Sequence, residues 1–236
     1  MNVAPFRGIT ALSAALWLIT GAAAAAAIPT AAEQRETEVV DRSFPFNPDG
    51  HLRLKNFSGK VTITGSNRAN VVVHAVRRAT RERLARIRLE IDATPAEISI
   101  EANRKDDRWD GDNDVVDTQF EIEVPQRATL DVHAFSSDVR ITGVEGKQRV
   151  HTFSGEIHLS DAAGPLDVET FSGDITVDFV PSASGRVDFD SFSGSLDSDM
   201  PMIYRAGRKR HISGDLGTGG PTTFHFKTFS GDVRIR

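Results

Sequence analysis

A short phrase, Phe-Ser-Gly-Asp followed by alternating apolar residues, recurs along the chain and constrains the fold more than any other feature. The copies begin at Phe57, Phe135, Phe153, Phe171, Phe192 and Phe229, with a weaker copy at Ile212. From Phe135 onward the spacings are 18, 18, 21, 20 and 17 residues. A near-constant short period is the signature of a stacked repeat architecture. The sequence therefore predicts a chain that winds into similar coils.

Apolar residues stand at fixed offsets from each phenylalanine. One lies three positions before it, and two lie four and six positions after it in every copy but that of Phe192, with polar residues between them. This period-two alternation is typical of strands with one buried face, so each copy predicts two strands. The fold class we predict is all-β, a single-stranded β-solenoid of short FSGD-type repeats. A β-sandwich built of hairpins of the same length is the main alternative.

The repeated residues themselves are predicted to be structural. Glycine accepts backbone conformations that other residues resist, so the glycine of each copy is expected to turn the corner. The phenylalanines are expected to stack in a continuous inner file at the ~4.8 Å spacing of strands. Ser137 in place of glycine and Ile212 in place of phenylalanine weaken two corners. The predicted set is Phe57, Phe135, Phe153, Phe171, Phe192, Phe229, Gly59, Gly155, Gly173, Gly194, Gly214 and Gly231.

The N-terminal half is predicted to be more meander-like. Alternation marks strands near Leu52–Leu54, 61–63, 71–76, 87–91, 98–100 and 120–124, and a short helix is expected around 80–85. Residues 103–117 form a charged loop that contains glycine. Short strands joined by polar turns favour antiparallel pairing in this half.

The first 27 residues have the order of a secretory signal peptide. One basic residue, Arg7, precedes the apolar run 9–19 and the alanine tract 22–27, which offers small-residue cleavage frames. We expect cleavage after Ala27, with Ala32 as the alternative frame and an uncleaved anchor as the alternative fate. The predicted organisation is a signal peptide at 1–27, a linker at 28–43 and a β-strand-repeat domain at 44–236. No second long apolar run follows, so no integral membrane segment is expected after cleavage, and the predicted location is periplasmic or secreted.

Composition excludes several classes of function. The chain has no cysteine, which excludes disulfides, thiolate metal sites and a cysteine nucleophile. Its net charge is −5 and its pI is about 5.8, which argues against a nucleic-acid partner.

The recurring phrase also carries a family resemblance. The pattern F-S-G-D-[IV]-x-[IV], preceded by an export signal and by NFSGKVTITG at Asn56–Gly65, resembles the bacterial "putative adhesin" family. The resemblance extends over roughly residues 44–236. It implies a domain of unknown function made of β-strand repeats, and it supplies no catalytic residues.

Two groups of residues have the chemistry of metal ligands. Asp110, Asp112 and Asp114 have the spacing of a calcium loop, but Val115 stands where a helix-loop-helix site needs glycine, so we interpret the segment as a solvated loop. His133, His151 and Glu169 fall in one outward column, two positions before the phenylalanine, and resemble a zinc ligand set. Because Asp190 and Lys227 continue the column, we interpret it as a soluble strand face. No metal and no cofactor are predicted.

Other polar groups receive similar interpretations. His158 could join a Ser-His-Asp set, but Ser193 and Ser230 belong to the corners and no G-x-S-x-G elbow is present, so no enzymatic activity is predicted. Six arginines between Arg77 and Arg88 could meet an anionic surface, or could simply cover one strand and turn. The acidic residue after most of the glycines could bind a cationic ligand or protect sheet edges.

We therefore predict an exported cell-envelope protein that acts as a non-enzymatic binding or structural (adhesin-like) module. Its partner is expected to be an unidentified protein or glycan of the envelope. The alternative is an envelope-stress sensor or accessory protein that recognises a glycan or a cationic peptide. A carbohydrate-active enzyme on a solenoid is the third hypothesis.

Overall fold

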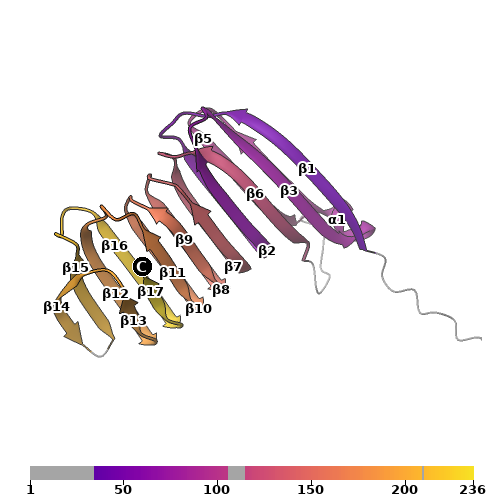
Figure 1. Cartoon of the computed structure of the whole chain (residues 1–236). Helices are drawn as coiled ribbons and strands as arrows, with labels where there is room; N and C mark the ends of the chain where they lie inside the picture. Colours follow the sequence, from indigo (N-terminus) through magenta and orange to yellow (C-terminus); the bar gives the residue numbers. More distant parts are fainter. Residues whose placement is uncertain (1–34, 106–114, 209) are drawn as a thin grey trace, which may run out of the picture. The chain divides into compact units, whose positions relative to one another are not determined.

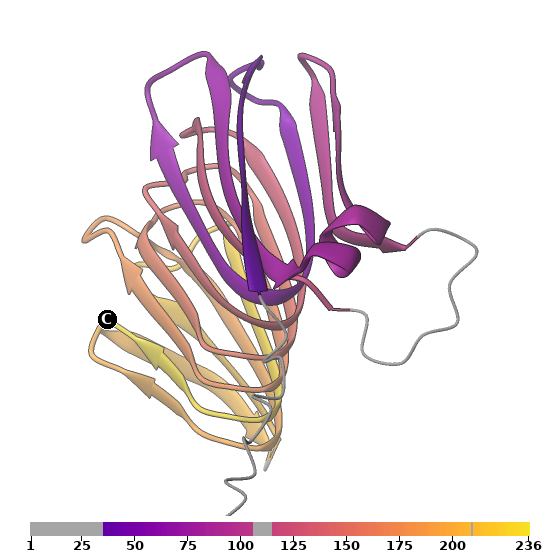
Figure 2. The same ribbon diagram turned by 90° about the vertical axis from the view of Figure 1, so that its right-hand side faces the viewer.

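The repeated phrase folds into coils. Each coil turns a corner at its Phe-Ser-Gly, or at Phe-Ser-Ser in the coil of Phe135, and continues on a second face (Figures 1 and 2). The computed structural model describes residues 35–105, 115–208 and 210–236, which all belong to the compact unit Glu33–Arg236. Two strands run through the corner without interruption, namely β2 (His51–Ser66) and β7 (Thr129–Thr142). The other coils are β8 (Gln148–Ser154) with β9 (Ile157–Ala162), β10 (Leu166–Ser172) with β11 (Ile175–Phe179), β12 (Gly185–Ser193) with β13 (Leu196–Ser198), and β16 (Thr223–Ser230) with β17 (Val233–Ile235).

Neighbouring coils pair in parallel, with their corners in register. Ser58 pairs with Ser136, Ser154 with Ser172, and Ser193 with Ser230. Figure 2 shows the coils as stacked loops, each with two arms that meet at the corner. The predicted all-β solenoid is confirmed.

The order of the coils in space differs from their order in the sequence. The C-terminal coil, β16–β17, lies between β10–β11 and β12–β13, because β16 pairs with both β10 and β12 and β17 pairs with both β11 and β13. The expectation that each phenylalanine stacks on the next one in the sequence is therefore wrong here. Because every copy has the same pattern of apolar residues, pairing does not depend on the order of copies in the chain.

Antiparallel strands flank the coils at both ends of the stack. They are β1 (Arg35–Pro45), β3 (Asn70–Thr80), β4 (Ile87–Ala93), β5 (Glu97–Lys105), β6 (Asp117–Pro125), β14 (Met202–Arg208) and β15 (His211–Leu216). β1 pairs with β3, β3 with β6, β4 with β5, and β15 with both β12 and β14. The N-terminal half thus contains the predicted antiparallel pairs, but β2 is parallel to both β5 and β6.

Two predictions about these end strands are wrong. The predicted linker, 28–43, contains most of β1, which begins at Arg35 and pairs along its whole length with β3. An edge strand needs few apolar residues because one of its sides faces solvent. The charged residues and the proline of β1, which suggest a linker in the sequence, are therefore compatible with a strand. The weak copy at Ile212 is no corner, since it lies in β15 and runs antiparallel to β12. Gly214 therefore lies within a strand.

A helix of one and a half turns, α1 (Arg81–Arg86), follows β3 close to where a short helix is expected. Thr80 caps it, because its hydroxyl accepts a hydrogen bond from the backbone N–H of Arg83 (3.4 Å). Arg77, which is 2% exposed, lies below it and contacts Glu38 of β1 and the carbonyl of Ile87. This buried guanidinium ties β1, β3 and the start of β4 together.

The core lies between the two faces and is filled by the predicted apolar offsets. Three positions before the corner phenylalanines, Val132, Val150, Val168, Phe189 and Phe226 are buried. The corner phenylalanines themselves are 41–54% exposed, so the predicted inner file is wrong. Successive side chains of a strand point to opposite faces, so a residue three positions from a buried one points outward. The inward position next to the corner is occupied instead by Thr152, Thr170 and Thr228.

The glycine corners bring adjacent backbones into close approach. Gly155, Gly173 and Gly231 have φ values of 125°, 140° and 148°, which side-chain-bearing residues rarely adopt. A Cβ on Gly173 would lie 2.2 Å from the carbonyl oxygen of Gly155 in the next coil. At Gly173 the two coils can therefore approach this closely only without a side chain. Ser137 occupies the same register position in β7, opposite Gly59, but it has no positive φ, and β7 runs through its corner as one strand.

Candidate functional site

The six corner phenylalanines form a continuous exposed ridge, which we call the Phe ridge. In spatial order it comprises Phe57, Phe135, Phe153, Phe171, Phe229 and Phe192. Adjacent ring centroids are 4.7–4.9 Å apart, and the rings are tilted by at most 14°. The ring faces therefore cover one another, and the ring edges face solvent.

The ridge exposes a large apolar surface. A phenylalanine side chain has about 200 Å² of surface, so six rings that are about half exposed present roughly 500 Å². Patches of this size on monomeric proteins are often functional. Since the coils fix the spacing of the rings, this surface is preformed.

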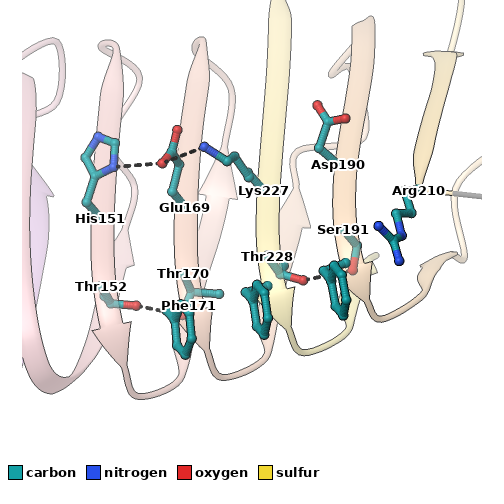
Figure 3. A pocket seen from close by; sticks show the side chains of 12 residues that line it. His151, Thr152, Glu169, Thr170, Phe171, Asp190, Ser191, Arg210, Lys227 and Thr228 are labelled. Atoms are coloured by element: carbon teal, nitrogen blue, oxygen red, sulfur yellow. Dashed lines mark hydrogen bonds and ion pairs between the residues drawn. The ribbon is translucent and has the colours of Figure 1, made fainter.

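A groove runs along the stack beside the ridge. Its three segments have volumes of about 560, 350 and 160 Å³. One wall is the Phe ridge, and the other is a row of outward side chains two positions earlier on each strand (Figure 3). We call this second wall the charged row, and in spatial order it consists of Lys55, His133, His151, Glu169, Lys227 and Asp190.

Hydrogen bonds between side chains of adjacent coils fix the strands under the groove. Thr152 donates to Thr170 across 3.0 Å, and the hydroxyls of Ser191 and Thr228 are 3.3 Å apart (Figure 3). At the other end the side-chain amide of Asn56 donates to the hydroxyl of Ser137 (3.2 Å). Because these hydrogen bonds link one strand to the next, the floor of the groove holds its shape.

The charges of the row alternate in sign toward the end formed by Asp190. Glu169 lies 3.6 Å from the imidazole of His151 and 3.5 Å from the ammonium of Lys227. The rings of His133 and His151 stack 5.0 Å apart. The structure thus places His133, His151 and Glu169, the residues that resemble a zinc ligand set in the sequence, on adjacent strands, and the two histidines stack face to face. At the end of the groove the guanidinium of Arg210 lies 4.1 Å from the ring centre of Phe192.

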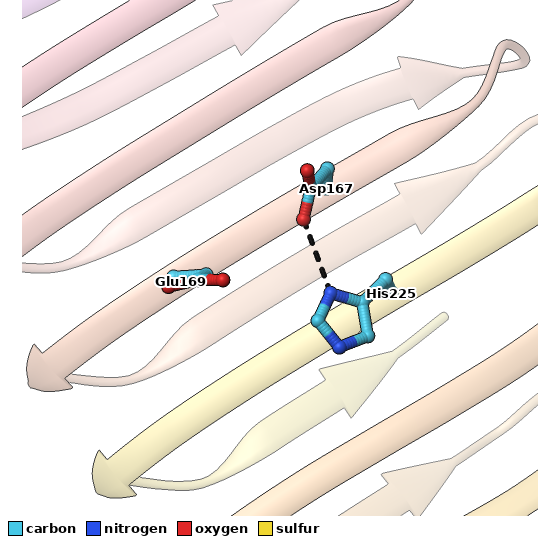
Figure 4. A group of neighbouring side chains, drawn as sticks. All are labelled: Asp167, Glu169 and His225. Carbon is cyan, nitrogen blue, oxygen red and sulfur yellow. Dashed lines mark hydrogen bonds and ion pairs between the residues drawn. The ribbon is translucent and has the colours of Figure 1, made fainter.

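A second polar cluster shares Glu169 with the charged row. Asp167, Glu169 and His225 place one ligand atom each within 4.8 Å of one another (Figure 4). His225 Nδ1 is 3.1 Å from Asp167, and His225 Nε2 is 3.6 Å from Asp190. Burial alone would raise the pKa of Asp167, but hydrogen bonds from His225 and Arg149 outweigh this and lower it. This cluster could not be predicted from the sequence, because Asp167 and His225 meet only through the insertion of the C-terminal coil.

The acidic residues after the corner have a structural role. Asp138 accepts a hydrogen bond from the backbone N–H of Glu156 (3.0 Å), and Asp174 accepts one from that of Asp232 (2.9 Å). Asp232 in turn accepts from the backbone and side chain of Ser195, both at 2.8 Å, and these bonds lower the pKa of Asp232. Each of these carboxylates thus caps the turn of the next coil, a role that the sequence analysis did not assign.

The remaining predicted candidates lie apart from the groove or outside the described residues. Asp110, Asp112 and Asp114 are among residues that the structure does not describe. His158 pairs with Asp178 (2.8 Å) on the strands that follow the corner, whereas Ser193 and Ser230 lie side by side at the corner itself.

The arginine run does not form one free cationic surface. Arg77 is buried, Arg81 pairs with Glu36 (3.3 Å), and Arg86 pairs with Glu82 (2.9 Å). These pairs support the interpretation that the run covers one strand and its turn. In the part of the chain that the structure describes, no helix has the length and apolar character needed to cross a membrane.

Comparisons with known proteins agree with this architecture. Residues 116–236, just over half of the chain, match the family model described as Toastrack DUF4097. The crystal structure of a putative cell adhesion protein from Clostridium sporogenes ATCC 15579 superposes with a TM-score of 0.61 at 10% identity, covering 86% of this chain and 99% of that one. A putative adhesin from Bacteroides fragilis NCTC 9343 gives a TM-score of 0.33 at 12% identity, covering 84% and 97%. No curated protein matches the sequence.

Proposed function

Because the chain belongs to the Toastrack DUF4097 family, we propose that it is an exported, non-enzymatic binding module of the cell envelope whose binding surface is the Phe ridge with its groove. Membership confirms the resemblance drawn from the repeated phrase. The Clostridium sporogenes structure, which shares the fold, is described as a putative cell adhesion protein, and this supports a binding role. The observation that carries the proposal is the exposed file of six stacked rings, built by a residue that every complete coil repeats.

The shape of the surface favours an elongated ligand. Six coils at ~4.8 Å spacing give the ridge a length of about 25 Å. The groove follows the ridge from Phe57 to Phe192, so a linear chain can contact both walls along this length. A compact small molecule would use only one segment.

The chemistry of the two walls favours a polypeptide over a neutral glycan. Sugars pack on the faces of aromatic rings, but the ridge presents edges because neighbouring rings cover the faces. Ring edges suit aliphatic and aromatic side chains. The opposite wall offers both charges within one segment, since Glu169 lies between His151 and Lys227, and so suits a chain that carries ammonium and carboxylate groups. We therefore propose an extended segment of an envelope protein as the partner.

Site-specific photocrosslinking in cells tests this proposal. The full chain carries p-benzoylphenylalanine in place of Phe153, at the centre of the ridge, or in place of Val39 on β1 as a matched control. Both side chains are about half exposed, and they lie on different parts of the fold. We expect an adduct with an envelope protein from position 153 and none from position 39. Replacing Phe171 and Phe229 with serine should reduce the yield of that adduct at least several-fold.

Two outcomes would contradict the proposal. Equal adducts from both positions would indicate adhesion without a defined site, and no adduct from position 153 would exclude the ridge as a protein-binding surface. Export is checked on the same cells by fractionation and N-terminal sequencing of the recovered chain. We expect envelope material that begins at Ile28, and a chain retained in the cytoplasm would overturn the envelope assignment.

A further inference from the structure

We propose that Asp167, Glu169 and His225 form a zinc-binding site on the outward face of β10 and β16, with Asp190 of β12 orienting the histidine. This site goes beyond the proposed binding function and does not depend on it. Among residues 35–105, 115–208 and 210–236, it is the only group of three or more potential metal ligands that lie close enough to share an ion.

Two of the three ligands, Asp167 and His225, already lie at a distance that suits one zinc ion. Asp167 and Glu169 are two residues apart on β10, so both point outward from the same face. His225 stands opposite Asp167 on the parallel strand β16, and its Nδ1 lies 3.1 Å from Asp167 Oδ1. Two ligands of one tetrahedral zinc ion are separated by about 3.3 Å, as follows from bonds of about 2.0–2.1 Å. Only the Glu169 side chain has to rotate toward the ion (Figure 4).

The second nitrogen of His225 faces a carboxylate, Asp190, which also pairs with His211 (2.9 Å) and has to approach His225 slightly to form a hydrogen bond. His225 Nε2 lies 3.6 Å from Asp190 Oδ2, on the far side of the ring from Asp167. Metal-bound histidines usually donate their other N–H to a carboxylate, which fixes the tautomer and makes the ligating nitrogen a better donor. All four side chains are partly buried, between 30% and 45% exposed, so water has access for the fourth coordination position.

The donor set selects the class of metal. One imidazole and two carboxylates suit zinc, whereas calcium and magnesium prefer sites made entirely of oxygen ligands. The chain has no cysteine, so thiolates do not compete for the ion.

Two neighbouring cations oppose zinc binding, so removing one of them should raise the affinity for zinc. Lys227 lies 3.5 Å from Glu169, and Arg149 lies 3.4 Å from Asp167. Both are substantially exposed, at 57% and 40%, so they can turn away when an ion enters. Repulsion between the ammonium and a divalent ion about 5 Å away should still weaken binding roughly fivefold to tenfold. Removing Lys227 should therefore tighten binding by that factor.

A metal here would fasten the C-terminal coil to its neighbour. β16 reaches its place between β10 and β12 from the end of the chain, and the site joins β10 to β16 directly. An ion that binds only the folded chain raises stability as its concentration rises above the dissociation constant. Zinc should therefore protect the C-terminal coil in particular.

The test is isothermal titration of Zn²⁺ into the untagged chain without its predicted signal peptide, with Ca²⁺ and Mg²⁺ titrated in parallel. We expect one Zn²⁺ per chain and no heat from the other two ions. His225→Ala should weaken binding at least 100-fold, Asp190→Asn should weaken it 10- to 100-fold, and Lys227→Gln should tighten it. The matched control is His158→Ala, which removes a histidine paired with one carboxylate, Asp178, but with no third ligand, and it should bind zinc as the wild type does.

Hydrogen exchange with and without Zn²⁺ gives a second measurement. We expect slower exchange in 223–230 and no change in β3, which lies at the other end of the stack. Absence of a 1:1 event, or equal binding by the wild type and His225→Ala when circular dichroism shows both to be folded, would overturn the site. Weaker zinc binding in His158→Ala would also overturn it, because it would assign the ion to another histidine.

Discussion

Replacing Gly173 with alanine tests the physical basis of the corner, because two separate costs meet at this residue. Its φ of 140° lies in a region that only glycine occupies readily, and forcing another residue there costs about 1–3 kcal/mol. The added Cβ would also lie 2.2 Å from the carbonyl oxygen of Gly155, so the two coils would have to separate locally. Separation weakens the hydrogen bond from the Gly155 N–H to the carbonyl of Ser172, which is worth about 1 kcal/mol.

Two other glycines separate these costs. Gly143 has a φ of 66°, but the nearest atom to an added Cβ is 4.0 Å away, so alanine there meets only the conformational cost of about 1 kcal/mol. Gly194 has no positive φ, but its Cβ would lie 2.1 Å from the carbonyl oxygen of Gly231, so alanine there meets only the close approach. We expect the loss at Gly173 to be about 4 kcal/mol and to approach the sum of the other two.

Urea denaturation monitored by circular dichroism measures the three free energies of unfolding. Because a domain of this size is stable by about 5–15 kcal/mol, the Gly173→Ala variant should still fold. The explanation is refuted if Gly173→Ala costs no more than Gly143→Ala, because the stacking of backbones at the corner would then contribute nothing.

Three further predictions concern stability. Replacing Glu38 with glutamine leaves the charge of Arg77, which is 2% exposed, without its ion pair, and should cost about 3 kcal/mol in urea denaturation; a loss below 1 kcal/mol would mean that this guanidinium finds water. Phe153→Ala removes a ring that stacks on two neighbours and is 45% exposed, and should cost about 2–3 kcal/mol, whereas an unstacked exposed ring would cost far less. Hydrogen bonds from Ser195 hold the pKa of Asp232 below its ordinary value of 3.8, so its stabilising effect is present above that pH and is lost as the pH falls through the lowered value. Asp232→Asn should therefore show a weaker loss of stability on acidification than the wild type, and parallel acid transitions would contradict this role.

The alternation of residues in the sequence predicts that the phenylalanines face outward, whereas the apolar character of their side chains predicts that they are buried. Counting by two from a buried residue such as Val150 places Thr152 inward and Phe153 outward. The predicted inner file rested on the apolar character of the ring, and the alternation of inward and outward residues contradicts it. Six rings can face solvent because stacking buries their faces, a favourable contact that arises only when the coils are in register.

The sequence by itself determined the coil: two strands, alternating inward and outward residues, and a corner that carries glycine in every coil but the one with Ser137. These features are local, since they depend on residues a few positions apart and on the geometry of one strand. Only the tertiary structure decided which coils are neighbours, because copies with the same pattern pair equally well and local sequence cannot rank them. The insertion of β16–β17 between β10–β11 and β12–β13 brings His225 to Asp167, orders the Phe ridge and sets the alternation of the charged row. Both proposed sites depend on that order of coils, which no single repeat encodes.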